Sequence, residues 1–166
     1  MFVADRSTFI MEGGAISGNS AVGTRGSGGG GAWVGEGSVF TMSGGEISGN
    51  SAVNAGGVSI GGNGNTFIMK GGAIFGNTVT RFGGGVMIGS GGNTFIMEGG
   101  RIQGGTDSDG FAKNTATLGY VSLAVNANYD TVKWGTGGTY TRGGVNQTGG
   151  GNIGDTNDTL IAIPAW

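Results

Sequence analysis

The chain of 166 residues contains no cysteine and no histidine. Without cysteine it has no disulfide, no cysteine-ligated zinc and no thiol nucleophile. Histidine is the commonest general base and the commonest metal ligand, so its absence removes Ser-His-Asp, Cys-His and His-zinc chemistry together. The composition therefore argues against an enzyme, and we expect no cofactor.

Charge and long apolar segments are scarce as well. Charged residues make up 11%, the formal net charge is -2 and the pI is about 4.9. With no basic excess, we expect no nucleic-acid partner. No apolar run approaches the roughly 18 residues of a membrane span, so we expect no membrane insertion. Residues 1–5 are too short for a signal peptide, and we interpret the chain as a mature region or a fragment of a longer protein.

Glycine, in contrast, supplies 43 residues, and it follows a period. One phrase recurs at residues 8–19, 39–50, 66–77 and 94–104. Its phenylalanine stands at Phe9, Phe40, Phe67 and Phe95, which gives intervals of 31, 27 and 28 residues. Periods between about 20 and 50 residues are typical of solenoids and propellers. The glycine content therefore reflects a repeat and does not predict disorder.

Each period contains three short segments of alternating apolar residues, bounded by glycine. Alternation predicts strands with one buried side. In the first segment Phe and Met share the buried side, in the second a single Ile is constant, and in the third Val58 and Ile60 flank a variable residue. Stacked coils bury apolar layers that one coil cannot bury alone. We therefore predict an all-β, three-faced parallel β-helix of 27–31 residues per coil over residues 1–125.

Other architectures fit less well. Propeller blades need roughly 40 to 50 residues, which is longer than this period. Helical solenoids are excluded by the glycine density and by the lack of a 3.6-residue period.

The repeat decays after residue 125. We expect residues 126–166 to form a degenerate final coil and a C-terminal cap, with strands at 129–134, 139–142 and 159–163 and a glycine-rich connection at 143–154. The candidate cap residues are aromatic or aliphatic: Trp134, Tyr140, Ile161 and Trp166. The N-terminus has no comparable cap, so its open strand edges favour end-to-end self-association.

Asparagine ends the second segment of three coils, at Asn19, Asn50 and Asn77. In stacked coils these side chains would form a ladder, because an amide both donates and accepts hydrogen bonds. A row of ligand-binding amides is the alternative interpretation. We favour a structural ladder that stabilises the turns.

Two departures from the repeat are candidate binding sites. In the first coil, a glycine-rich bulge at residues 26–31 precedes Trp33, which we expect to point outward. In the fourth coil, residues 105–113 are inserted ahead of Asn114. Insertions in solenoids project from one side and often carry binding.

The insertion holds two carboxylates and one aromatic ring. Asp107 and Asp109, followed by Gly110, are similar to the start of a calcium loop, but the remaining ligands of such a loop are missing. A solvated turn is the alternative. The speculative binding residues are Asp107, Asp109, Phe111 and Trp33.

The Gly-Gly-Ala-Ile phrases at residues 13–16 and 71–74, with Gly-Asn corners and Gly-Gly-Val-x-Ile strands, resemble the right-handed parallel β-helix repeats of bacterial surface proteins. Those proteins have the pectin-lyase-like fold. The phrases are also similar to repeats of polymorphic outer membrane proteins and autotransporter passengers, which act as adhesins. The companion F-x-x-N motif is not found, because Phe75 and Asn77 have a different spacing. The resemblance implies a right-handed helix and a bacterial cell-surface or extracellular location.

Three functions remain. The first is a non-catalytic scaffold or adhesin-like module that binds a glycan or a host surface protein. The second is a polysaccharide lyase or hydrolase, which the fold permits, although the carboxylates are scattered. The third is an ice-binding or crystal-binding solenoid, suggested by the outward Thr and Ile residues of the first segment. We favour the scaffold because residues at outward positions vary, as at Ala15, Glu46, Ala73 and Arg101.

Overall fold

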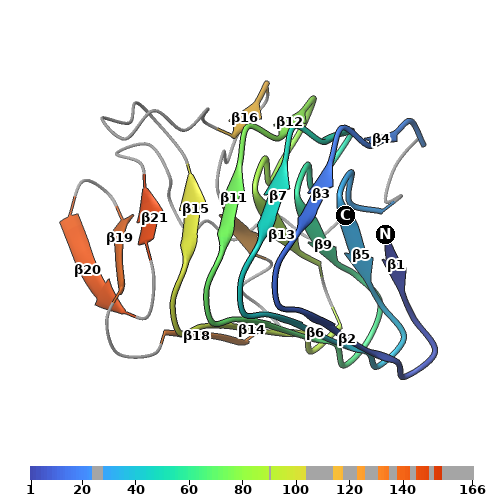
Figure 1. Cartoon of the computed structure of the whole chain (residues 1–166), viewed down its shortest axis with the longest axis horizontal. Helices are drawn as coiled ribbons and strands as arrows, with labels where there is room; N and C mark the ends of the chain where they lie inside the picture. Colours follow the sequence, from blue (N-terminus) through green and yellow to red (C-terminus); the bar gives the residue numbers. More distant parts are fainter. Residues whose placement is uncertain are drawn as a thin grey trace.

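The computed structural model describes residues 1–23, 28–89, 91–103 and 114–117, and the backbone of the strands at 123–125, 131–134, 138–142, 145–149 and 152–154. Within these residues every regular element is a β-strand. The chain winds into a parallel β-solenoid of about three turns, with about 28 residues per coil. Figure 1 shows the strands of successive coils side by side, from β3 through β7 and β11 to β15. The predicted parallel β-helix is therefore confirmed.

Strands from successive coils assemble into three main sheets. Sheet A contains β1 (Phe2–Val3), β5 (Ala32–Val34), β9 (Val58–Ile60), β13 (Val86–Ile88) and β17 (Leu123–Val125). Sheet B contains β2 (Thr8–Met11), β6 (Val39–Met42), β10 (Thr66–Met69), β14 (Thr94–Met97) and β18 (Thr131–Trp134). Sheet C begins with β3 (Ala15–Ser17), β7 (Glu46–Ser48), β11 (Ala73–Phe75) and β15 (Arg101–Gln103). These sheets are the three predicted segments.

A fourth, narrower sheet was not predicted. Sheet D contains β4 (Ser20–Ala21), β8 (Ser51–Ala52), β12 (Thr78–Val79) and β16 (Thr115–Ala116). Each of these strands has only two residues, which is too short to show an alternating pattern. A coil therefore carries four strands, where the sequence predicted three.

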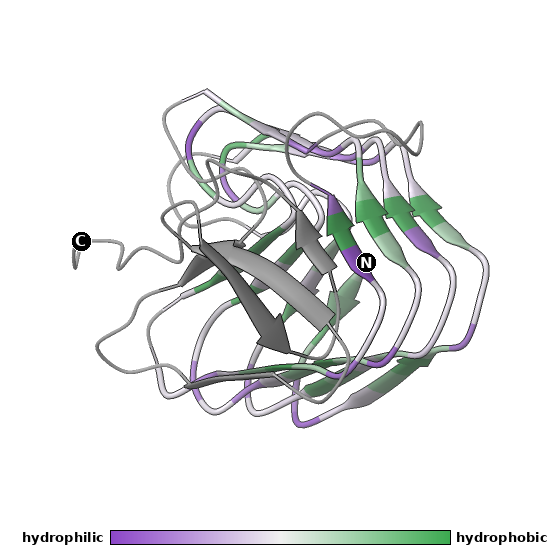
Figure 2. Ribbon diagram, turned by 90° about the vertical axis from the view of Figure 1, so that its left-hand side faces the viewer, coloured by the Kyte–Doolittle hydropathy of each residue, from purple (hydrophilic) through white to green (hydrophobic). Residues whose placement is uncertain are grey.

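The repeated phrase aligns residue by residue between coils. Phe40 pairs with Phe9 and Phe67, and Met42 pairs with Met11 and Met69. Since side chains alternate between the two sides of a strand, a slip of one residue would move this whole set out of the core. In the end-on view of Figure 2, apolar stretches recur at the same place in successive coils.

The interior is built from columns of identical or similar side chains. The phenylalanine rings of neighbouring coils stack with centroid distances of 4.9 Å between Phe40 and Phe67 and 5.2 Å between Phe67 and Phe95. The methionine and isoleucine columns are equally buried, at Met42, Met69, Met97, Ile47, Ile74 and Ile102. Among the residues whose burial is described, the core positions of the first coil are incompletely covered, because Phe9 and Ile16 are partly buried. The predicted inward positions are thus confirmed.

Glycine pairs are required where one coil passes closely over the next. A Cβ on Gly71 would lie 2.4 Å from the Ser43 carbonyl oxygen, and one on Gly72 would lie 2.6 Å from the Gly45 carbonyl oxygen. Gly72 also has a φ of +82°, which glycine adopts without a Cβ penalty. The Gly-Gly dipeptide of an internal coil therefore serves both close approach and the turn.

The sheets continue beyond residue 125. β18 adds to sheet B in parallel, and β21 (Asn152–Gly154) adds to β15 in parallel. β19 (Gly138–Arg142) and β20 (Val145–Gly149) form an antiparallel pair at the end of sheet C. The prediction of a connection without strands at residues 143–154 is wrong, because both β20 and β21 lie in this range. Backbone hydrogen bonding joins β20 to β19 and β21 to β15. The side chains proposed as a cap, and the strand expected at 159–163, lie outside the described residues.

Truncating a ring in the middle of the phenylalanine column should cost more than truncating its exposed end. We expect Phe67→Ala to lower the free energy of unfolding by about 3–5 kcal/mol, because it leaves a cavity between two stacked rings. Phe9→Ala should cost clearly less, because Phe9 has a ring neighbour in one direction only. Denaturant unfolding followed by circular dichroism measures both, and equal losses would contradict the stacking account.

Candidate functional site

The corner between sheets C and D carries a column of asparagine side chains, at Asn19, Asn50, Asn77 and Asn114. Asn50 and Asn77 are 1% and 0% exposed, so their amides need partners inside the protein. Asn19 Nδ2 donates to Asn50 Oδ1, Asn50 Nδ2 to Asn77 Oδ1 and Asn77 Nδ2 to Asn114 Oδ1, each at 2.9 Å. The column is thus a continuous hydrogen-bonded chain along the solenoid axis.

Each internal amide of this column also satisfies backbone groups. Asn77 Oδ1 accepts the Asn50 backbone N–H at 3.0 Å, and Asn77 Nδ2 donates to the Ile47 carbonyl at 2.9 Å. Asn114 repeats the pattern with the Asn77 N–H and the Ile74 carbonyl. The buried amides therefore bond to one another and to the backbone of the corner, and none of their hydrogen-bonding groups is left to bind a ligand.

A second polar column was missed by the sequence analysis. Ser38, Asn65 and Asn93 are fully buried at the corner before sheet B. The Ser38 N–H donates to Asn65 Oδ1, and Asn65 Nδ2 donates to Asn93 Oδ1 at 2.8 Å. The signal was present, because each of these residues directly precedes the first strand of its coil. Two ladders, not one, hold neighbouring coils in register.

The insertion of the fourth coil begins and ends at the first ladder. In the other coils one glycine separates the end of the sheet C strand from the asparagine, as at Gly76. Between Gln103 and Asn114 this single glycine is replaced by residues 104–113. The backbone N–H and Nδ2 of Asn114 both donate to the Gln103 carbonyl, at 3.0 and 2.5 Å. The two ends of the insertion are therefore held together at one corner.

Three of the predicted binding residues, Asp107, Asp109 and Phe111, belong to this insertion and lie outside the described residues. Gln103, at the end of the sheet C strand before the insertion, is only 3% exposed. In the three preceding coils the equivalent residues Ser17, Ser48 and Phe75 are exposed or half-buried.

Trp33, the fourth predicted binding residue, is half-buried on the outer side of sheet A. Its ring stacks on Phe2 with a centroid distance of 4.4 Å and an angle of 10° between the planes. The ring also lies over Gly35, where a Cβ would collide with it, and beside Gly61, where a Cβ would lie 3.1 Å from the Trp33 Nε1. Phe2 itself is 71% exposed. The pair forms an aromatic patch at the N-terminal end of sheet A.

The remaining outward residues are chemically mixed. Glu12, Ser43, Lys70 and Glu98 occupy the same position of successive coils and are all exposed. Among the described residues, no group of three or more acidic, histidine or cysteine side chains is placed to hold a metal ion. In the same part of the chain no helix is long and apolar enough to cross a membrane.

Geometry and topology define the class of this protein as a parallel β-solenoid. No family model, no curated protein and no solved structure matches the chain.

A substitution inside the first ladder separates a structural role from a ligand-binding one. We expect Asn77→Ala to lower the free energy of unfolding by roughly 2–6 kcal/mol, because the Asn50 N–H and Nδ2 lose their buried acceptor. Asn19→Ala should cost less than about 1 kcal/mol, because Asn19 is exposed and its loss leaves no buried donor unpaired. Thermal and denaturant unfolding of both variants tests this, and a stable Asn77→Ala protein would contradict it.

Proposed function

We propose that this chain is a non-catalytic scaffold or adhesin-like module of a bacterial surface or secreted protein, and that it is part of a longer protein. Its kinship with right-handed, pectin-lyase-like β-helices belongs to the same proposal. The observation that carries it is the contrast between a constant interior and a varied exterior. Phe, Met and Ile fill the core of successive coils, whereas the outward residues of sheet C change in charge from coil to coil, as at Glu46, Ala73 and Arg101.

The use of the buried polar groups supports this proposal. Enzymes need polar groups that are free to act on a substrate. Here the buried asparagines of both ladders are bonded to one another and to the backbone. A rod of this kind presents side chains at fixed distances and needs no reactive centre to do so.

The binding element that we propose is the insertion at residues 105–113, with a glycan or a host surface protein as its partner. It is the largest departure from the repeat. The residues that flank it, Gln103 and Asn114, are hydrogen-bonded to each other at a corner where the other coils have a single glycine. Such an arrangement tolerates sequence change in the loop without disturbing the stacked coils.

Replacing residues 104–113 by a single glycine restores the corner found at Gly76 and keeps Asn114 in the ladder. We expect the shortened protein to unfold at a temperature close to that of the parent and to lose binding on a panel of glycans and matrix proteins. Glu12→Gln, which changes an exposed residue of the first coil, is the control and should still bind. Binding that survives the replacement would place the site elsewhere, and no binding by the full chain would leave a structural spacer.

A second candidate is an ice- or crystal-binding solenoid, favoured by the outer side of sheet B. There the outward residues form two straight columns, Thr8–Val39–Thr66–Thr94 and Ile10–Thr41–Ile68–Ile96. Successive members are about 4.8 Å apart, as in any parallel sheet. A flat, repeated lattice of small apolar and hydroxyl groups suits an ordered solid surface.

Measurement of thermal hysteresis, the gap between the melting and freezing points of ice, tests this second candidate. Under it, the chain depresses the freezing point below the melting point, and Ile68→Lys, which places a charge in the middle of the lattice, removes the effect. Ala73→Lys, a similar change on the outward side of sheet C, is the matched control and should retain it. A chain without hysteresis excludes the ice-binding role.

A further inference from the structure

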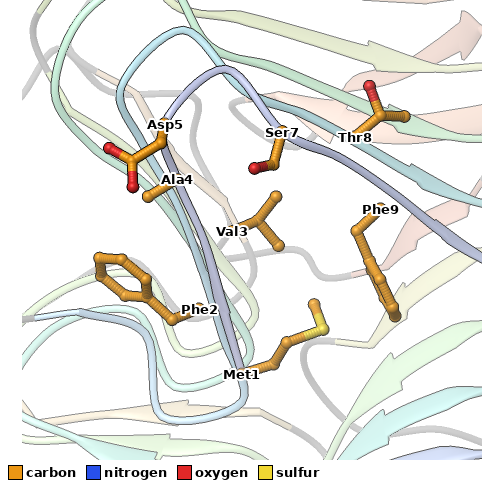
Figure 3. Close-up of a pocket in the computed structure, with 8 residues that line it drawn as sticks. All are labelled: Met1, Phe2, Val3, Ala4, Asp5, Ser7, Thr8 and Phe9. Carbon is orange, nitrogen blue, oxygen red and sulfur yellow. The ribbon is translucent and has the colours of Figure 1, made fainter.

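The first coil ends in an open surface, the N-terminal face, formed by the free edges of β1, β2, β3 and β4. Each of these strands is the last member of its sheet. A hollow lined by residues of the first coil, including Val3 and Phe9, opens at this end. In Figure 3, Met1 and Phe9 extend to one side of the chain trace and Phe2 to the other. Apolar core side chains therefore reach the surface here.

The pairing of the internal coils shows which backbone N–H groups point out of the N-terminal face. The N–H groups of Val39, Glu46 and Ser51 donate to carbonyls of the first coil at 2.9, 2.9 and 2.8 Å. Their first-coil equivalents are Thr8, Ala15 and Ser20. Because these residues lie on the free edges, the same N–H groups point out of the face and are open to carbonyl acceptors.

The asparagine ladder is polar, and its open end lies on this face. Each internal amide oxygen accepts two hydrogen bonds from the preceding rung, as Asn50 Oδ1 does from the N–H and Nδ2 of Asn19. No described residue donates to Asn19 Oδ1. Asn50 Nδ2 donates to a carbonyl of the preceding coil, at Ile16, whereas Asn19 Nδ2 turns back to Ser17 of its own coil. The face therefore offers an open amide acceptor at this point.

Gly13 gives a third, independent observation. Its counterparts Gly44, Gly71 and Gly99 cannot bear a Cβ, since each would lie 2.4 Å from a carbonyl oxygen of the preceding coil. A Cβ on Gly13 would meet nothing within 4 Å. Nothing in the described structure requires glycine at this position. A coil stacked on the N-terminal face would require it.

We propose that the N-terminal face is a docking surface for one further coil of this same repeat, stacked in the parallel direction of the internal coils. Such a coil supplies carbonyls for Thr8, Ala15 and Ser20, an amide donor for Asn19, and an apolar layer for Phe9 and Ile16. It continues an interface that already joins the coils of this chain. The inference does not depend on the proposed function.

A second copy of the chain fits this face less well. Two N-terminal faces brought together each present an open amide acceptor at Asn19, and the Nδ2 of each Asn19 already donates within its own chain to Asn50 and Ser17. At the opposite end, sheet C finishes with β20, which runs antiparallel to β19. That edge does not reproduce the parallel edge of an internal coil. The chemistry therefore favours a repeat coil over a second copy.

The test extends the chain with a copy of residues 58–85, placed directly before Met1. The junction keeps the register, because Phe2, Trp33, Ser59 and Met87 are equivalent positions of sheet A. We expect the melting temperature to rise by about 5 °C or more, since one more coil interface is formed. The control extension carries serine at the copied positions of Phe67, Met69 and Ile74 and should give no rise. A copy of residues 32–57 provides a second extension in the same register.

Gly13→Ala then reports directly on stacking. In the original chain it should leave the melting temperature unchanged or slightly raised. In the extended chain it should remove most of the gain, and Gly44→Ala in the original chain is the positive control for the clash. The proposal is overturned if neither extension exceeds the serine control, or if Gly13→Ala has the same effect in both chains. It is also overturned if light scattering finds a dimer of the original chain that the extension abolishes, because a second copy would then be the occupant.

Discussion

The polar groups at the coil corners must find hydrogen-bond partners away from water, and the rest of this structure depends on how they do so. An unpaired buried amide costs about 1–3 kcal/mol, so a corner that places Asn50 or Asn77 at near-zero exposure is stable only if the next coil carries a matching amide. The ladders thereby fix the register between coils. Once the register is fixed, Phe67 lies between Phe40 and Phe95, and the other apolar side chains stack in columns in the same way.

Because buried groups alone fix the register between coils, the outward side chains are free to vary. Register is specified by buried amides and by glycines that permit close approach, such as Gly72 over Gly45. Neither device involves an outward side chain, so Ala73 can pair with Glu46 on one side and Arg101 on the other at little cost. The corner beside the first ladder is equally tolerant. It is closed by Gly76 in one coil and spans residues 104–113 in the next, while Asn114 still completes the ladder.

Sequence reasoning succeeded where one residue type serves one purpose in every coil. Phe, Met and Ile recur at positions that the structure buries, and alternation alone assigns their side of the strand. It failed where the pattern is too short or the partner is remote. The two residues of β8 show no periodicity, and the column through Ser38 mixes serine with asparagine. The stacking of Trp33 on Phe2 joins residues 31 positions apart and leaves no local signal. In residues 143–154, glycine content suggested a connection, but backbone pairing alone suffices to form β20 and β21.

The ladders also give the solenoid a direction. In the first ladder the amide-to-amide hydrogen bonds all run from one coil to the next coil toward the C-terminus, so the two sides of a coil differ chemically even though the coils are nearly equivalent. In a repeat array each coil is stabilised by its two neighbours, and among the described residues the first coil contacts only one. Its core residues Phe9 and Ile16 are accordingly partly exposed. Any fraying that starts at the N-terminal face should therefore be limited by the first fully bonded rung at Asn50, where burial and the amide chain act together.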